Sequence, residues 1–165
     1  MRSVLLAFAL LLITPPGAQA QSTEASAPEA AVRATIDLLF DAMRAGDSTQ
    51  VRQAFHPEGL MRTAALGEDG VPVLSEMPVG AFAQAVGQPR DDRWDERLFD
   101  VEIRVDGPLA TAWTPYAFYR GDQFSHCGVN AFQLIDTPAG WRITSIMDTR
   151  QREGCEIPEE VQRGG

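Results

Sequence analysis

The second half of the chain carries the side chains best suited to chemistry on a bound molecule. The segments Ala110 to Arg120 and Gln123 to Ile135 have the length and apolar content of long strands, and Gly121-Asp122 between them predicts a hairpin turn. Side chains alternate along a strand, so residues in every second position share one face. Six ring or amide side chains fall on one face of this hairpin: Trp113, Tyr119, Phe124, His126, Asn130 and Phe132.

The predicted register places Ala117 opposite His126 and Trp113 opposite Asn130. Aromatic rings on such a wall can stack on a planar ligand, while an imidazole and an amide supply orienting hydrogen bonds. A buried imidazole can also act as an acid or a base near neutral pH. The alternative is an ordinary core, with His126 and Asn130 bonded to backbone groups. The wall therefore predicts a small-molecule pocket, with packing alone as the competing interpretation.

Asp148 is the second candidate for chemistry. It lies near the end of the last expected strand, Trp141 to Arg150, which should neighbour the preceding strand. Its carboxylate is a candidate proton acceptor, and the alternatives are a surface contact with Arg150 or a strand-end hydrogen bond. Ile143 and Ile146 cannot both face inward without a β-bulge, so the pattern leaves the direction of Asp148 open.

Cys127 and Cys155 are the only cysteines. In an oxidising compartment two cysteines most often form a disulfide, which would tie the C-terminal tail to the sheet. The alternative is a nucleophilic Cys127 activated by His126. Adjacent strand residues point to opposite faces, which makes that dyad geometrically poor. We therefore expect the Cys127–Cys155 disulfide.

The charge of the chain excludes several classes of function. The 14 basic residues are outnumbered by 23 acidic ones, for a net charge of −9, whereas nucleic acids and anionic membranes attract a basic surface. Every basic residue is Arg, which excludes a Schiff-base lysine and a phosphate-loop lysine. The chain has two histidines, which argues against a His-rich zinc site. We expect no nucleic-acid partner, no cofactor and no metal.

The first twenty residues have the three parts of a cleavable secretion signal. Arg2 supplies the positive start, Val4 to Ile13 is an apolar run too short to span a bilayer, and Ala18-Gln19-Ala20 is a cleavage site. We therefore expect an exported protein, periplasmic or secreted, with no membrane contact after cleavage. The expected organisation is a signal peptide (1–20), a flexible leader (21–27), one domain (28–155) and a C-terminal tail (156–165).

The elements that must position these side chains come as helices first and strands afterwards. Ser26-Ala27-Pro28-Glu29 is a capping box ahead of apolar residues at helical spacing, and Gly46 ends that helix. Shorter helices are expected after Asp47 and at about Pro78 to Val86. The charged run Arg90 to Arg97 is expected to be a solvated loop.

Strand patterns are expected before and within the second half of the chain, at Leu60 to Ala65, Val71 to Leu74 and Phe99 to Val105 and in the three long segments that follow. Helices followed by a strand meander are typical of α+β proteins. We expect a curved antiparallel sheet packed on a long N-terminal helix and two shorter helices.

Three segments resemble a known superfamily: Ala42 to Asp47 leading to Phe55-His56-Pro57-Glu58, Ser125 to Phe132, and Gly140 to Thr144 ending at Asp148-Thr149-Arg150. Together they resemble the nuclear-transport-factor-2-like superfamily, and within it the lumazine-binding branch. The resemblance covers roughly Pro28 to Cys155. It implies a cone-shaped roll in which a curved sheet wraps the N-terminal helix.

The resemblance and the residues leave three functions open. The first is an exported small-molecule-binding protein with an aromatic-lined cone pocket and a ligand that the residues do not identify. The second is a ketosteroid-isomerase-like or polyketide-cyclase-like isomerase or dehydratase, with Asp148 or His126 as acid or base. The third is a homodimeric module whose sheet docks a partner. This architecture hosts all three classes, so the fold alone does not choose.

Overall fold

The computed structural model describes residues 25–163. The expected signal peptide, Met1 to Ala20, and most of the expected leader lie outside the described residues. No helix among the described residues is long and apolar enough to cross a membrane. The helices are α1 (Ala27–Ala45), α2 (Ser48–Ala54), α3 (Val79–Val86) and α4 (Glu159–Arg163). The strands are β1 (Phe55–Leu66), β2 (Pro72–Pro78), β3 (Trp94–Leu98), β4 (Glu102–Asp106), β5 (Leu109–Arg120), β6 (Gln123–Thr137) and β7 (Gly140–Thr149).

Helix α1 forms where its capping signals predict it. The Ser26 side chain accepts the backbone N–H of Glu29, and the Glu29 carboxylate accepts the backbone N–H of Ser26. The helix ends at Gly46, whose φ of 69° is in the left-handed region that glycine adopts without strain. Its predicted apolar stripe is buried, as the spacing indicates: Val32, Ile36, Leu39, Phe40 and Met43.

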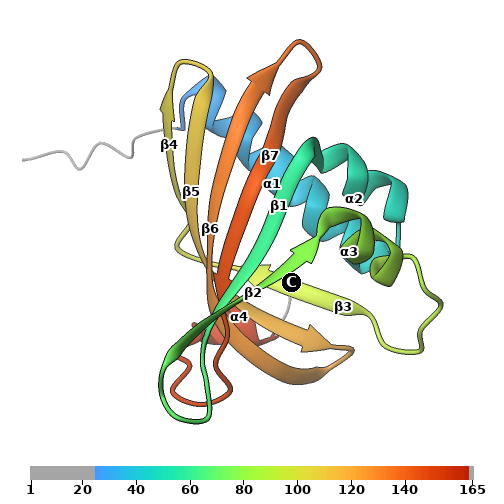
Figure 1. Cartoon of the computed structure of the whole chain (residues 1–165), viewed down its shortest axis with the longest axis vertical. Coiled ribbons are helices and arrows are strands. Elements are labelled where there is room, and N and C mark those ends of the chain that lie inside the picture. The colour runs from blue at the N-terminus through green and yellow to red at the C-terminus, as the bar shows by residue number, and fades with distance from the viewer. Residues whose placement is uncertain (1–24, 164–165) are drawn as a thin grey trace, which may run out of the picture.

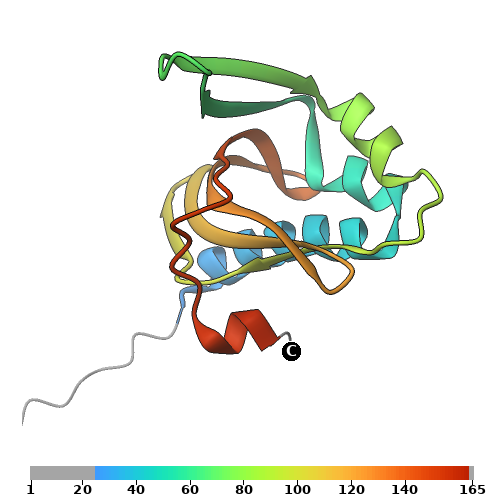
Figure 2. The same cartoon turned by 90° about the horizontal axis from the view of Figure 1, so that it is seen from below.

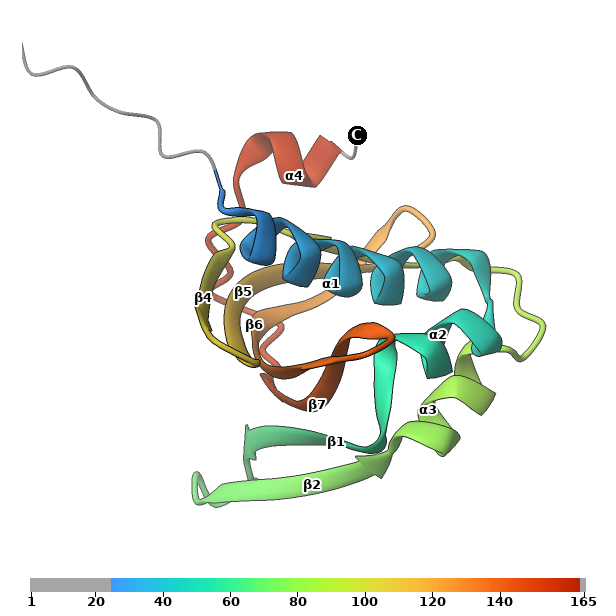
Figure 3. The same ribbon diagram turned by 90° about the horizontal axis from the view of Figure 1, so that it is seen from above.

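The strands form one curved sheet that wraps α1, with the order β2-β1-β7-β6-β5-β3 and β4 also paired to β5 (Figure 1). Strands β1 and β7 run parallel, and the other neighbours are antiparallel. The α+β cone predicted from the sequence is therefore confirmed, with one parallel pair in a mostly antiparallel sheet. Figures 2 and 3 show the β1–β2 hairpin reaching away from α1, with α3 at its end.

The run Arg90 to Arg97 corrects the prediction of a solvated loop. Trp94–Leu98 is strand β3, which pairs with the end of β5 from Arg120 to Tyr116. Asp95 in this strand is 5% exposed and is ion-paired with Arg97 at 2.8 Å. Ion pairing lets a charged segment enter the sheet, because the buried carboxylate keeps compensating partners.

The predicted register of the β5–β6 hairpin is correct at the turn and wrong beyond it. Tyr119 pairs with Phe124 as predicted, but His126 pairs with Phe118, and Asn130 with Thr114. A β-bulge between Phe118 and Tyr119 adds one residue to β6 and shifts every later pair by one position. Trp113 therefore pairs with Ala131 rather than with Asn130, and its side chain lies on the face of the sheet opposite to that of His126 and Asn130.

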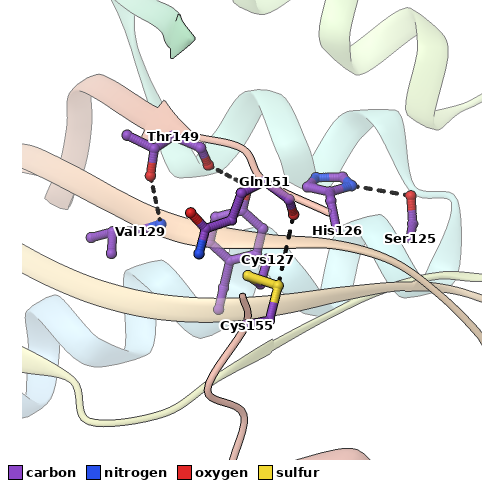
Figure 4. The surroundings of a disulfide bond; sticks show 8 residues. Ser125, His126, Cys127, Val129, Thr149, Gln151 and Cys155 are labelled. Carbon is purple, nitrogen blue, oxygen red and sulfur yellow. Dashed lines mark hydrogen bonds between the residues drawn. A yellow bond between two sulfur atoms is a disulfide. The ribbon is translucent and has the colours of Figure 1, made fainter. Parts of the chain in front are cut away.

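The predicted disulfide is present and excludes the Cys127–His126 dyad. Cys127 in β6 is bonded to Cys155, with the Cα atoms 6.1 Å apart and a sequence separation of 28. Figure 4 shows the disulfide on one side of β6 and the His126 ring on the other. A closed loop of this length stabilises a fold by roughly 3–4 kcal/mol in the chain-entropy view. The bond holds the segment that leads to α4 against the sheet.

Candidate functional site

A cavity of about 590 Å³ lies between α1, α3 and the concave side of the sheet. Its size falls in the range of small-molecule sites. The apolar part of the lining consists of Leu39, Phe40, Met43, Met61, Met77, Phe82, Ala85, Trp94, Phe118 and Ile146. The polar part consists of Arg62, Thr63, Ser75, Glu76, Glu96, Tyr116, Arg120, His126, Asn130, Asp148 and Arg150.

Asp148 faces this cavity and is ion-paired to Arg150, so the predicted contact between these two residues is present, with Asp148 buried rather than on the surface. The Thr63 hydroxyl donates to its Oδ1 at 2.5 Å, and Arg150 Nε donates to its Oδ2 at 2.6 Å. The residue is 8% exposed. A second β-bulge, between Gln133 and Leu134 in the β6–β7 pairing, lies where the two core isoleucines of β7 require it.

Glu96 brings a second carboxyl group to the same end of the cavity. Asn130 Nδ2 donates to Glu96 Oε1 at 2.8 Å, and Asn130 also pairs with Asp148 across β6 and β7. Burial is the main cause that raises the pKa of Glu96 to about 7. The charge of Asp148 acts in the same direction, and the Asn130 hydrogen bond and the charges of Arg150 and Arg44 oppose it. Glu96 is therefore divided between its protonated and ionised forms at neutral pH.

Asn130 is the residue that connects the two carboxyl groups. Besides Glu96, its Nδ2 donates to Thr114 Oγ1 at 3.4 Å, so the side chain is held from both β3 and β5. Asn130 is 5% exposed. A buried amide held by two partners has a fixed orientation, which a site that recognises hydrogen-bonding groups requires.

His126 lines the cavity as a neutral ring. Its centroid lies 4.9 Å from that of Phe118 and 5.7 Å from that of Tyr116, and its Nδ1 lies 3.1 Å from Ser125 Oγ. Burial lowers its pKa to about 4, with Arg150 acting in the same direction and Asp148 opposing it. At neutral pH the ring is therefore unprotonated and offers no acidic proton.

Tyr116 fixes the β5 wall beside His126. Its hydroxyl donates to the backbone oxygen of Thr149 at 2.9 Å. Burial raises the pKa of the phenol, and the charges of Glu96 and Asp148 act in the same direction. The phenol therefore stays protonated and serves as a hydrogen-bonding and packing group.

The other four residues of the predicted wall do not line the cavity: the β-bulge moves Trp113, Tyr119 and Phe124 off the face of His126, whereas Phe132 keeps that face and is buried in the core. Trp113 is 54% exposed on the outer face of the sheet. The Arg97 guanidinium lies over the Tyr119 ring, 4.0 Å from its centroid, and the Tyr119 ring also packs against Phe124. Phe132 is buried in the core with its ring edge on Phe40. Of the six predicted wall residues, His126 and Asn130 line the cavity.

The sequence reasoning missed Glu96 and the two β5 residues that replace Trp113 and Tyr119 in the lining, Tyr116 and Phe118. One signal for Glu96 was present. Trp94, Glu96 and Leu98 occupy alternate positions, which is a strand pattern inside the charged run.

Comparison with known proteins agrees with this architecture. The model of the family described as "putative lumazine-binding" matches residues 27–147. The chain is similar to a solved nuclear-transport-factor-2-like protein with a cystatin-like fold from Novosphingobium aromaticivorans, at 19% identity and a TM-score of 0.60, over 78% of this chain and 84% of that one. No curated protein matches.

Two further solved structures have the same fold. A protein of unknown function from Mycobacterium tuberculosis is 17% identical with a TM-score of 0.60, over 82% of this chain and 84% of that one. A protein described as a "putative dehydratase" from Streptomyces avermitilis is 14% identical with a TM-score of 0.54, over 75% and 96%. Likeness at these identities shows a shared cone fold.

Proposed function

The chain belongs to the putative lumazine-binding family, and from that premise we propose that it is an exported small-molecule-binding protein whose ligand occupies the cavity between α1 and the sheet. The observation that carries the proposal is a cavity of about 590 Å³ whose lining combines apolar side chains with a connected polar group, Glu96, Asn130 and Asp148. Small-molecule sites combine these two properties. The secretion signal in the sequence and the disulfide support export.

Filling the cavity should abolish binding. Ala85 of α3 lines the cavity, whereas Ala81 of the same helix is exposed and outside it. We expect Ala85→Trp to weaken the binding of 1-naphthalenemethanol at least about tenfold in isothermal titration calorimetry, since the indole would occupy the ligand volume. The matched variant Ala81→Trp should bind as the wild type does. Absence of binding to the wild type, or equal binding by both variants, would contradict the proposal.

A second candidate function is proton transfer on the bound molecule. It is favoured by two carboxyl groups in one cavity with different surroundings, Asp148 bonded to Arg150 and Glu96 with a pKa raised to about 7 by burial. Asp148 would act as the base and protonated Glu96 as the acid, whereas His126, with a pKa lowered to about 4 by burial, is not suited to the acid role. Deuterium uptake from D₂O into a bound ligand distinguishes catalysis from binding alone.

We also propose that the outer face of the sheet forms a homodimer contact. This face presents four large exposed apolar side chains, and a patch of this kind is typical of a protein interaction surface: Leu109, Trp113, Ile135 and Met147. Native mass spectrometry of the mature chain should give the mass of a dimer, and Trp113→Asp should shift it to the monomer. The matched variant Ala81→Asp, at an exposed position of α3 away from this face, should remain a dimer and tests whether any added charge has this effect. A monomeric wild type would reject the dimer.

A further inference from the structure

The charges around the cavity leave one carboxyl group without an ionic partner. Three arginines line the cavity, and each is ion-paired to a carboxylate: Arg62 to Glu76, Arg120 to Asp92 and Arg150 to Asp148. Within residues 25–163, the Glu96 carboxyl group makes no ion pair. Arg44 is near, but its guanidinium binds the backbone oxygen of Glu96 and the side chains of Asp41 and Asp95. The cavity therefore has an unused negative charge and no unused positive one.

The groups that adjoin Glu96 leave two acceptor oxygens free of hydrogen bonds from the described residues. Asn130 Nδ2 donates to Glu96 Oε1 and to Thr114, so its unpaired atom is the amide oxygen, an acceptor. Glu96 Oε2 receives no hydrogen bond from any described residue. The Tyr116 hydroxyl proton is directed to the backbone of Thr149. A ligand group that contacts Glu96 and Asn130 therefore meets acceptor oxygens and must bring donors, whereas the remaining N–H groups of Arg150 belong to a cation whose charge Asp148 already offsets.

From these two observations we propose that the cavity selects a ligand with a positively charged, hydrogen-bond-donating nitrogen on an apolar ring system. The inference rests on the proposed small-molecule function and specifies the class of ligand. An ammonium group or a protonated ring nitrogen would ion-pair with Glu96 and donate to the Asn130 amide oxygen. The rings of Phe118 and Tyr116 add cation–π attraction and cover the apolar part. A carboxylate ligand would instead meet Glu96 with no free arginine to bind it.

Three probes with the same naphthalene ring system but different charges separate the effect of charge on binding from that of shape: 1-naphthylmethylamine, 1-naphthalenemethanol and 1-naphthoate. At pH 8 we expect the amine to bind about tenfold tighter than the alcohol, and the carboxylate to bind most weakly. Glu96→Gln should remove the advantage of the amine and leave the affinity for the alcohol within about twofold. Glu102→Gln, an exposed position on β4, is the matched control and should behave as the wild type does.

A second measurement does not depend on any variant. The advantage of the amine should fall between pH 8 and pH 5.5, because Glu96, with its pKa raised to about 7 by burial, becomes protonated. The charged groups that face Glu96 are Asp148 and Arg150 from β7 and the chain after it, and Arg44 from α1. His126, with its pKa lowered to about 4 by burial, stays neutral across this range.

The outcomes separate the two proposals. Equal binding of all three probes, with loss in Ala85→Trp, would leave the cavity as the binding site and overturn the preference for a cation. Tightest binding of 1-naphthoate would overturn it as well. Failure of every probe to bind the folded wild type would overturn both proposals. An amine preference that Glu96→Gln abolishes and Glu102→Gln retains supports both.

Discussion

Gly128→Ala is expected to lower the free energy of unfolding by about 4 kcal/mol, among the largest effects of a single substitution in this fold. A Cβ atom at position 128 would lie 1.9 Å from the backbone oxygen of Thr149 and 3.1 Å from the Tyr116 ring. No side-chain rotation relieves a clash with backbone, so β6 and the end of β7 would have to separate. Urea denaturation followed by circular dichroism measures the loss.

Gly80→Ala is the matched control for this substitution. A Cβ at position 80 of α3 would meet nothing closer than the Arg52 guanidinium, at 3.6 Å. It should leave stability unchanged or raise it by about 0.5 kcal/mol, because alanine restricts the unfolded chain. A Gly128→Ala protein within about 1 kcal/mol of the wild type would mean that the two strands do not approach this closely. The same change should also weaken ligand binding, because Tyr116 and Asp148 lie on either side of the contact.

The fold could be predicted from the sequence because its signals are local. The capping box at Ser26 and Glu29, the stop at Gly46 and the turn at Gly121 each depend on a few neighbouring residues. The disulfide could be predicted for a different reason, because Cys155 is the one other cysteine with which Cys127 can pair. Local signals and a unique pairing are sufficient to place α1 to α3, the long strands and the start of the tail, whereas α4 within the expected tail was not predicted.

The site could be predicted only in part, because its composition depends on one β-bulge. A β-bulge has little effect on stability and no reliable sequence signature. Its one extra residue nevertheless moves the side chains beyond it to the other face of the sheet relative to the partner strand. The bulge beside Phe118 explains why Trp113 is on the outer surface. His126 and Asn130 stayed together because both lie on the same side of it in β6.

Glu96 was hidden for a different reason. The run from Arg90 to Arg97 has the composition of a solvated loop, and hydrophobic periodicity gives little weight to charged residues. Its place in the sheet depends on partners distant in sequence, among them Asn130 and Arg44. Such long-range pairing is not visible in one sequence.

Glu96→Gln should stabilise the protein by about 2 kcal/mol at pH 8 and leave it nearly unchanged at pH 4.5. The pKa of Glu96 is raised by burial from 4.5 to about 7 in the folded protein. Between these values the folded protein holds a proton that the unfolded chain releases, so the contribution of this group is greatest below 4.5. That contribution is lost as the pH rises through 7, where the cavity must hold an ionised carboxylate. Glutamine does not titrate and escapes the loss.

The difference in unfolding free energy between the wild type and Glu96→Gln separates the titration of Glu96 from that of His126, which also lines the cavity. The pKa of His126 is lowered by burial to about 4, so its contribution is present above 6.5 and is lost as the pH falls, the opposite slope. Because His126 is the same in both proteins, its effect cancels in the difference. Urea unfolding at half-unit steps from pH 4.5 to pH 8.5 should therefore give a gap that opens between about 5 and 7 and then levels off. A gap independent of pH would show that Glu96 titrates as an exposed glutamate does, and would contradict the expected fall of the amine preference between pH 8 and pH 5.5.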